Sequence, residues 1–214
     1  MPIDKRRESR VIAVIFADAL DDGDPDALRA SLRAALERVN QVFAPAVAEP
    51  FALAGEGRLD GALADPAQAP LLISVLRELI APAQLRVGVG VGTVERLREG
   101  AGHDAYSIAR RALQLAARDD GLTRYLGTGE AGDVLLAALC RLVDPLIRAR
   151  TRKQWEAIAA YRQLGHQRDV ATKLGVTRQS VGDRLAAGHR RAVEEADAAV
   201  ATYLSHIRRR RFAP

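Results

Sequence analysis

Cysteine and aromatic residues are scarce in this chain of 214 residues. Cys140 is its one cysteine, and aromatic side chains make up 4% of the sequence. A single cysteine excludes an internal disulfide framework and a cysteine metal cluster. The shortage of aromatic side chains argues against binding single-stranded nucleic acid by base stacking. The core must therefore be built from Ala, Leu and Val, within an apolar share of 48%.

Long apolar runs and paired histidines are also missing. No run approaches the ~20 apolar residues that a membrane-spanning helix needs. The charged start MPIDKRRESR does not fit a signal peptide. We therefore expect a cytoplasmic protein that has no membrane partner. The four histidines are scattered without a metal-ligand spacing, so the sequence predicts no metal site.

Charge is divided unevenly along the chain. The net charge is +5, but residues 146–214 hold 15 Lys and Arg against 6 Asp and Glu, a net of +9, and residues 1–145 carry −4. A strongly basic segment is typical of proteins that bind a polyanion, because neutralising phosphates releases counterions. The second part of the chain is therefore predicted to bind nucleic acid.

Hydrophobic patterning predicts an α+β fold. Apolar or alternating runs predict strands at 11–17, 48–54, 59–64, 85–91 and 123–126. Helical spacing predicts helices at 25–44, 67–80, 103–118, 133–148, 151–164 and 188–211. The first six elements run strand–helix–strand–strand–helix–strand, which is the split βαβ plan of ferredoxin-like folds.

These elements suggest two domains. We expect a ferredoxin-like domain over residues 9–128 and an all-α domain over residues 133–211, with 127–132 as the most linker-like stretch. The charged turn at 148–153 is the alternative boundary. The glycines in RVGVGVG lie inside a predicted strand, so they do not form a dinucleotide-binding turn. We expect them instead to let a helix or a ligand approach the sheet closely.

The segment 167–187, QRDVATKLGVTRQSVGDRLAA, predicts a helix–turn–helix. Ala171 allows two helices to cross closely, and Gly175 can take the positive φ of a tight turn. Thr177 is placed to cap the second helix, which in this motif enters the major groove of DNA. An ordinary helical hairpin is the alternative.

Side chains suited to bases and phosphates surround this segment. Arg and Gln can pair with purine edges, and Ser or Thr can contact a base or a phosphate. Asp183 can accept a hydrogen bond from a cytosine amino group or pair with a neighbouring Arg. The residues that we expect to contact DNA are Arg168, Lys173, Thr177, Arg178, Gln179, Ser180, Asp183, Arg184, His189 and Arg190.

The final predicted helix carries an apolar stripe. Its members are Ala192, Val193, Ala196, Ala199, Val200, Tyr203 and Leu204. One helix–turn–helix reads only a short half-site, and pairing two chains roughly doubles the contacts. We therefore expect a homodimer, with this stripe as a candidate contact.

Several segments together resemble the SatD family of bacterial proteins over nearly the full chain. They are the strand that ends at Asp18, the helix that ends VNQVF, and the segments LAGEGRLDGAL, LRVGVGVG and RKQWEAIAAYRQLGHQRDVATKLGVTRQSVGDRL. The resemblance implies a front domain similar in layout to class III nucleotide cyclase and diguanylate cyclase domains. Those domains hold two metal ions with one carboxylate after the first strand and another at the central hairpin.

The chain departs from this family at the hairpin. The family has Gly-Asp-Glu-Phe-Gln where this chain has GEGRL at 55–59, so only Asp18 is left as a candidate for a metal ligand. Two-metal chemistry needs carboxylates from facing elements, so we expect a degenerate site with no catalytic residues. Asp18, Gly55, Glu56, Gly57 and Arg58 are instead candidates for binding a nucleotide. The alternative is that the glycines only form the turn and that Arg58 is solvated.

These observations favour a sequence-specific transcriptional regulator that binds double-stranded DNA. Its cyclase-like domain would sense a ligand or pair two chains. The alternative is a nucleotide-processing enzyme with a helical domain that anchors it to DNA.

Overall fold

The computed structural model of the chain describes residues 11–20, 23–55, 57–93 and 104–210. Their strands form one sheet in the order β2-β3-β1-β4-β5. The strands are β1 (Val11–Leu20), β2 (Val47–Leu53), β3 (Arg58–Leu63), β4 (Gln84–Thr93) and β5 (Thr123–Leu126). With the helices below, this arrangement confirms the predicted α+β class.

Helices account for most of the remaining described residues. They are α1 (Pro25–Val42), the short 3-10 helix η1 (Pro66–Gln68), α2 (Ala69–Ile80), α3 (Ala105–Arg118), α4 (Glu130–Arg148), α5 (Arg152–Leu164), α6 (Gln167–Leu174), α7 (Arg178–Ala187) and α8 (Arg190–Arg210). None of the helices in the described part of the chain is both long and apolar enough to cross a membrane.

β1 is the central strand, and it is covered on both faces. Its alternate residues Val11, Ala13 and Ile15 belong to the core that includes α1 and α2. Ile12 and Val14 belong to a second core with residues of α3. A strand buried on both faces must be apolar throughout, which explains the continuous run in the sequence. β1 pairs antiparallel with both β3 and β4, as the split βαβ plan requires.

The glycines of β4 let α3 lie directly on the sheet. A Cβ atom added to Gly88 would come within 2.2 Å of the Leu113 backbone nitrogen, and one added to Gly90 within 2.3 Å of the Ala105 carbonyl oxygen. No side chain fits in that space. The expected close approach is therefore made by a helix.

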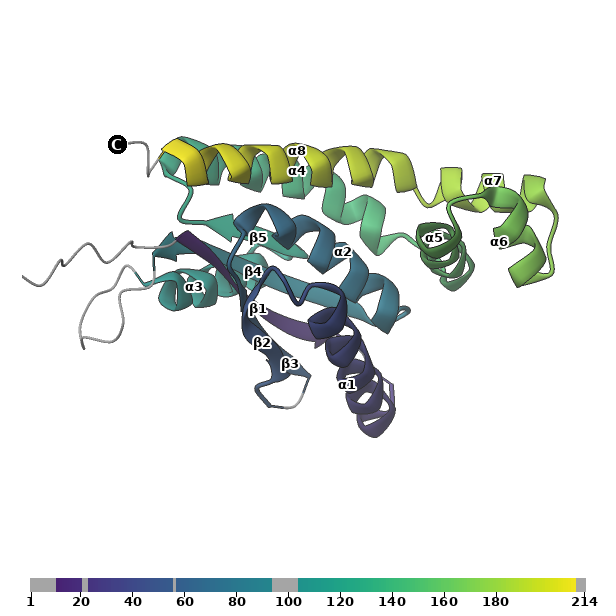
Figure 1. The fold of residues 1–214 in the computed structure, drawn as a ribbon, viewed down its shortest axis with the longest axis horizontal. Coiled ribbons are helices and arrows are strands. Elements are labelled where there is room, and N and C mark those ends of the chain that lie inside the picture. The colour runs from purple at the N-terminus through teal and green to yellow at the C-terminus, as the bar shows by residue number, and fades with distance from the viewer. Residues whose placement is uncertain (1–10, 21–22, 56, 94–103, 211–214) are drawn as a thin grey trace, which may run out of the picture.

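α4 and α8 run side by side along the sheet layer, and α5, α6 and α7 gather at one end of the molecule (Figure 1). Leu136 and Cys140 of α4 join Val200 and Leu204 of α8 in the main core, together with residues of the sheet. The Asp144 carboxylate accepts hydrogen bonds from the Leu122 and Thr123 backbone nitrogens, at 2.7 and 3.0 Å. Both long helices are thus fixed to the front of the chain. The division into domains 9–128 and 133–211 stays a prediction.

The expected linker at 127–132 is a tight turn that leads directly into a helix. α4 begins at Glu130, inside that segment. The Asp133 carboxylate accepts hydrogen bonds from the Thr128 backbone nitrogen at 2.9 Å and hydroxyl at 2.7 Å. A Cβ on Gly127 would lie 2.1 Å from the Val91 carbonyl oxygen. Gly127 therefore serves close packing at this position.

Candidate nucleic-acid interface

Helices α5, α6 and α7 share a small apolar core of their own. Its buried members are Ala157, Ile158, Ala160, Val170, Ala171, Val181 and Leu185. Thr151 and Gln154 form a reciprocal capping box that starts α5. We refer to residues 152–187 as the α5–α7 unit. Its two later helices and their turn occupy the segment 167–187.

The turn between α6 and α7 depends on local backbone chemistry. Gly175 ends α6 with a φ of 64°, in the left-handed region that favours glycine. The Val176 backbone nitrogen then donates to the Ala171 carbonyl oxygen at 3.0 Å, which closes the end of the helix. Thr177 starts α7, since its hydroxyl accepts from the Ser180 backbone nitrogen at 3.1 Å.

α7 presents polar side chains on its outer side. Val181 and Leu185 are buried, whereas Gln179 and Asp183 are exposed. At 3.6 residues per turn, Gln179 and Asp183 lie on one stripe on the far side from the buried pair. Arg178 is exposed in the first turn of the helix. These side chains are placed to reach a ligand that lies along α7.

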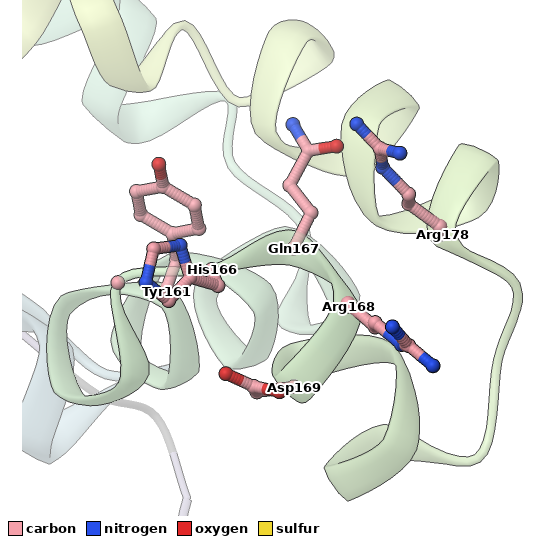
Figure 2. Close-up of a pocket in the computed structure, with 7 residues that line it drawn as sticks. Tyr161, His166, Gln167, Arg168, Asp169 and Arg178 are labelled. Carbon is pink, nitrogen blue, oxygen red and sulfur yellow. The ribbon is translucent and has the colours of Figure 1, made fainter.

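An open groove borders the starts of α6 and α7. It has a volume of about 580 Å³ and is lined by Tyr161, Gly165, His166, Gln167, Arg168, Asp169 and Arg178. Figure 2 shows that the side chains of Gln167 and Arg178 extend toward the same side of this groove. The positive end of the α6 dipole and the exposed Arg168 lie at its edge. This combination suits an anionic group such as a phosphate.

The other expected DNA contacts are placed differently from one another. Lys173 is exposed, and its Nζ donates to the Gln163 side-chain oxygen at 2.9 Å. His189 is exposed in the turn before α8, whereas Ser180 and Arg184 are half-buried. Arg190 is half-buried too, because its guanidinium stacks over the Tyr161 ring at 4.4 Å and forms an ion pair with Glu194. Arg190 is therefore engaged within the chain.

Two arginines that the sequence did not single out attach the α5–α7 unit to the rest of the chain. Arg162 of α5 forms an ion pair with Glu78 of α2 at 2.7 Å. Arg150 donates from Nε to the Gly188 carbonyl oxygen at 2.8 Å and stacks over the Trp155 ring at 4.6 Å. Burial lowers the pKa of Arg150 to about 10. No periodic signal links residues so far apart, so sequence patterns could not have found these contacts.

The candidate ligand residues of the front domain lie where β1 and β3 meet the hairpin. Asp18 sits opposite Arg58 on β3 and Arg86 on β4 in the strand register. The Arg58 Nε lies 3.3 Å from the Asp18 carboxylate. Gly55 and Gly57 both have positive φ, of 141° and 68°. Glu56 lies outside the described residues.

The Asp18–Arg58 ion pair changes what this corner can do chemically. The Arg58 guanidinium places a positive charge beside the one carboxylate that the sequence offered as a metal ligand. Among the described residues, no group of three or more His, Cys, Asp and Glu side chains is arranged to hold a metal ion. The Arg58 side chain is 72% exposed, so its outer edge remains open to an anion.

Comparisons with known proteins show no family for the chain. No family model matches it, and no curated protein matches it. The crystal structure of a regulator of polyketide synthase expression from Bifidobacterium adolescentis aligns with 94% of this chain and 86% of that chain. The two share 16% sequence identity with a TM-score of 0.27, which is too low to support an argument about function.

Proposed function

We propose that this chain binds double-stranded DNA with sequence preference through α6 and α7. The observation that carries the proposal is the stripe of exposed polar side chains, Gln179 and Asp183, which follows the exposed Arg178 along α7. α7 has 10 residues, and an α-helix of about 10–12 Å diameter fits the major groove. Arginine and glutamine there can form paired hydrogen bonds with guanine and adenine.

Phosphate contacts complete this proposed interface. Arg168 and the start of α6 would bind the DNA backbone on one side of the major groove, and Lys173 would bind the DNA backbone on the other side. Such contacts set register and orientation without reading sequence. The net charge of +9 over residues 146–214 supplies the long-range attraction. Arg190 is left out of the proposed interface because it pairs with Glu194.

We infer that the protein acts as a transcriptional regulator whose front domain controls the DNA-binding part. The resemblance to the SatD family and to the cyclase layout supports this role. Arg58 and the backbone at Gly55 and Gly57 would bind a nucleotide phosphate there. Glu78 of α2 pairs with Arg162 of the α5–α7 unit, so α2 links the front domain to the proposed DNA-binding part.

The alternative, a nucleotide-processing enzyme with a DNA anchor, conflicts with the Asp18–Arg58 ion pair. A positively charged guanidinium beside the carboxylate opposes binding of a divalent cation. We expect the native chain and the Asp18→Asn variant to give the same yield of product when each is incubated with nucleotide triphosphates and magnesium or manganese. Turnover by the native chain that Asp18→Asn abolishes would restore the enzyme interpretation.

Selection from a pool of random duplexes tests DNA reading without knowledge of the operator. Several rounds of binding and amplification should enrich a defined motif, because base contacts distinguish sequences. Gln179→Ala should enrich a different or shorter motif. Arg152→Ala is the matched control, because Arg152 is exposed at the first position of α5 and pairs with Glu156. A pool that remains random after selection would contradict the proposed function.

A further inference from the structure

α4 exposes an apolar stripe that no described element covers. Val134, Leu135 and Leu142 have 65%, 58% and 73% of their surface exposed. Ala131, Ala138 and Pro145 are exposed as well. At 3.6 residues per turn these residues fill an arc about 100° wide that holds no charged side chain, the width expected of a helix face that packs on something.

The larger members of the stripe that the sequence favoured for pairing two chains are buried on α8, whereas Ala192 and Ala199 are exposed. Val193, Val200 and Leu204 have 2%, 5% and 1% of their surface exposed, because they pack into the chain's own cores. The inner side of α4 is likewise occupied, with Leu136 and Cys140 in the main core. The outer side of α4 is thus a large aliphatic surface with no partner among the described residues. Contiguous surfaces of this kind mark interaction sites.

We propose that a second copy of this chain covers the stripe, with the two α4 helices packed antiparallel across a two-fold axis beside Ala138. Apart from Leu135, whose counterpart is Arg141, the stripe is symmetric about that residue. Val134 and Leu142 lie four positions before and after Ala138, and Ala131 and Pro145 lie seven positions before and after it. The rotation therefore brings Leu142 against Val134 of the second copy, twice. A two-fold interface requires this self-complementarity.

Two of the charges beside the stripe favour the same arrangement, and a third, the exposed Arg141, pairs with Asp119 of its own chain at 3.7 Å. Glu130 at the start of α4 and Arg148 at its end lie on the same flank, about 80° from the centre of the stripe. Antiparallel packing places Glu130 of each copy within about one turn of Arg148 of the other. Parallel packing would instead oppose Glu130 to Glu130. The antiparallel arrangement also sets the two helix dipoles head to tail.

The pairing stands independently of the proposed function, but it would serve that function. The α5–α7 unit follows the C-terminal end of α4, so antiparallel pairing sends the two units to opposite ends of the dimer. Two-fold related reading elements are what a palindromic operator with spaced half-sites requires. This relation to DNA is the one step that rests on the proposed function.

Sedimentation equilibrium of the full chain tests the pairing. The native chain should give twice the 23.1 kDa of one copy. Val134→Glu/Leu142→Glu should raise the dimer dissociation constant by about 100-fold or more, because each buried unpaired charge costs at least a tenfold step. Val42→Glu is the matched control, since Val42 of α1 is 50% exposed outside the stripe. It should remain a dimer with the native dissociation constant.

Circular dichroism melting separates loss of pairing from loss of folding. Both glutamate variants should keep the helical signal of the native chain. A monomeric native chain, or a Val134→Glu/Leu142→Glu variant that dimerises as tightly as Val42→Glu, would overturn the proposal. If Val134→Glu/Leu142→Glu unfolds, Ala138→Cys in a Cys140→Ala background replaces it as the deciding variant. Ala138→Cys should cross-link on oxidation, whereas Val42→Cys in the same background should not.

Measuring DNA binding alongside the oligomeric state separates the pairing of two chains from the proposed function. A dimer that ignores duplex sequence would leave the pairing intact and overturn the DNA reading. A monomer that selects a motif would do the reverse.

Discussion

Arg162 of α5 and Glu78 of α2 form a two-point ion pair, with Nε 2.8 Å from one carboxylate oxygen and Nη2 2.7 Å from the other. The side chain of Glu78 is only 6% exposed. The paired guanidinium is therefore the main compensation for a nearly buried charge. This contact joins the α5–α7 unit to the helix layer of the sheet.

Removing this guanidinium should destabilise the chain more than removing an exposed one. Arg162→Ala leaves the Glu78 carboxylate without its partner, so we expect a loss of about 1–3 kcal/mol in the free energy of unfolding. Arg152→Ala breaks only an exposed pair with Glu156 and should cost about 0.5 kcal/mol or less. Urea unfolding measures both values. Equal losses would mean that the Glu78 contact does not fix the unit.

Two glycines in the α6–α7 segment should respond in opposite directions to alanine. Gly175 has a φ of 64°, so Gly175→Ala should destabilise the α5–α7 unit by about 1–2 kcal/mol. Gly182 lies inside α7 with its nearest side-chain neighbour 3.7 Å from an added Cβ. Gly182→Ala should stabilise by about 0.5–1 kcal/mol, since alanine favours helix. Thermal melting compares the stability of the two variants. A stabilising effect of Gly175→Ala would contradict the left-handed turn conformation at this residue.

The charged carboxylate of Asp197 in α8 should destabilise the folded state at neutral pH. Burial raises the pKa of its carboxyl above 3.8, although the Ser74 hydroxyl donates to it at 2.6 Å and Arg77, Arg150 and Arg162 favour its charged form. The folded state therefore binds the proton more tightly than the unfolded state, and its stability falls as pH rises through the raised pKa.

Asp197→Asn removes that cost while keeping an acceptor for Ser74. We expect a higher midpoint of urea unfolding at pH 7, and a gain that shrinks as pH falls toward 3.8. Glu195→Gln is the control, because Glu195 is exposed and pairs with Arg191. A gain for Asp197→Asn that stays constant between pH 7 and pH 4 would contradict the assignment.

Arg178 and Lys173 should affect DNA binding in different ways. Arg178→Ala removes a base contact, so it should weaken the preferred duplex by about 10- to 100-fold and change scrambled duplexes little. Lys173→Ala removes a phosphate contact and should weaken all duplexes similarly, with a shallower salt dependence. Competition binding measures both ratios. An Arg178→Ala variant with unchanged sequence preference would mean that α7 is not the helix that reads the DNA sequence.

Local signals explain why so much of the fold could be predicted from the sequence. Gly175 and Thr177 act on backbone groups within a few residues, so their roles can be read from the chain alone. The apolar run of β1 likewise reports burial on both faces. These patterns say that a face is apolar or that a turn is needed, and the structure agrees at each of these positions.

Contacts between distant segments could not be predicted in this way. The stripe on α8 was correctly identified as apolar, but Val200 and Leu204 pack into the chain's own core. Arg190 was expected at DNA on charge alone, and its stacking on Tyr161 depends on how α5 and α8 cross. The pairing of Asp18 with Arg58 follows from the β1–β3 register, which no periodicity specifies.

Fluorescence anisotropy with the duplex upstream of the chain's own gene decides whether α7 reads DNA sequence. The titration runs against a scrambled duplex of equal length across a salt series. A sequence-reading α7 predicts a preference of ~10³ or more that persists at physiological salt. Equal binding to both duplexes with the same steep salt dependence would contradict sequence reading by α7, because the basic half would then be a non-specific anchor.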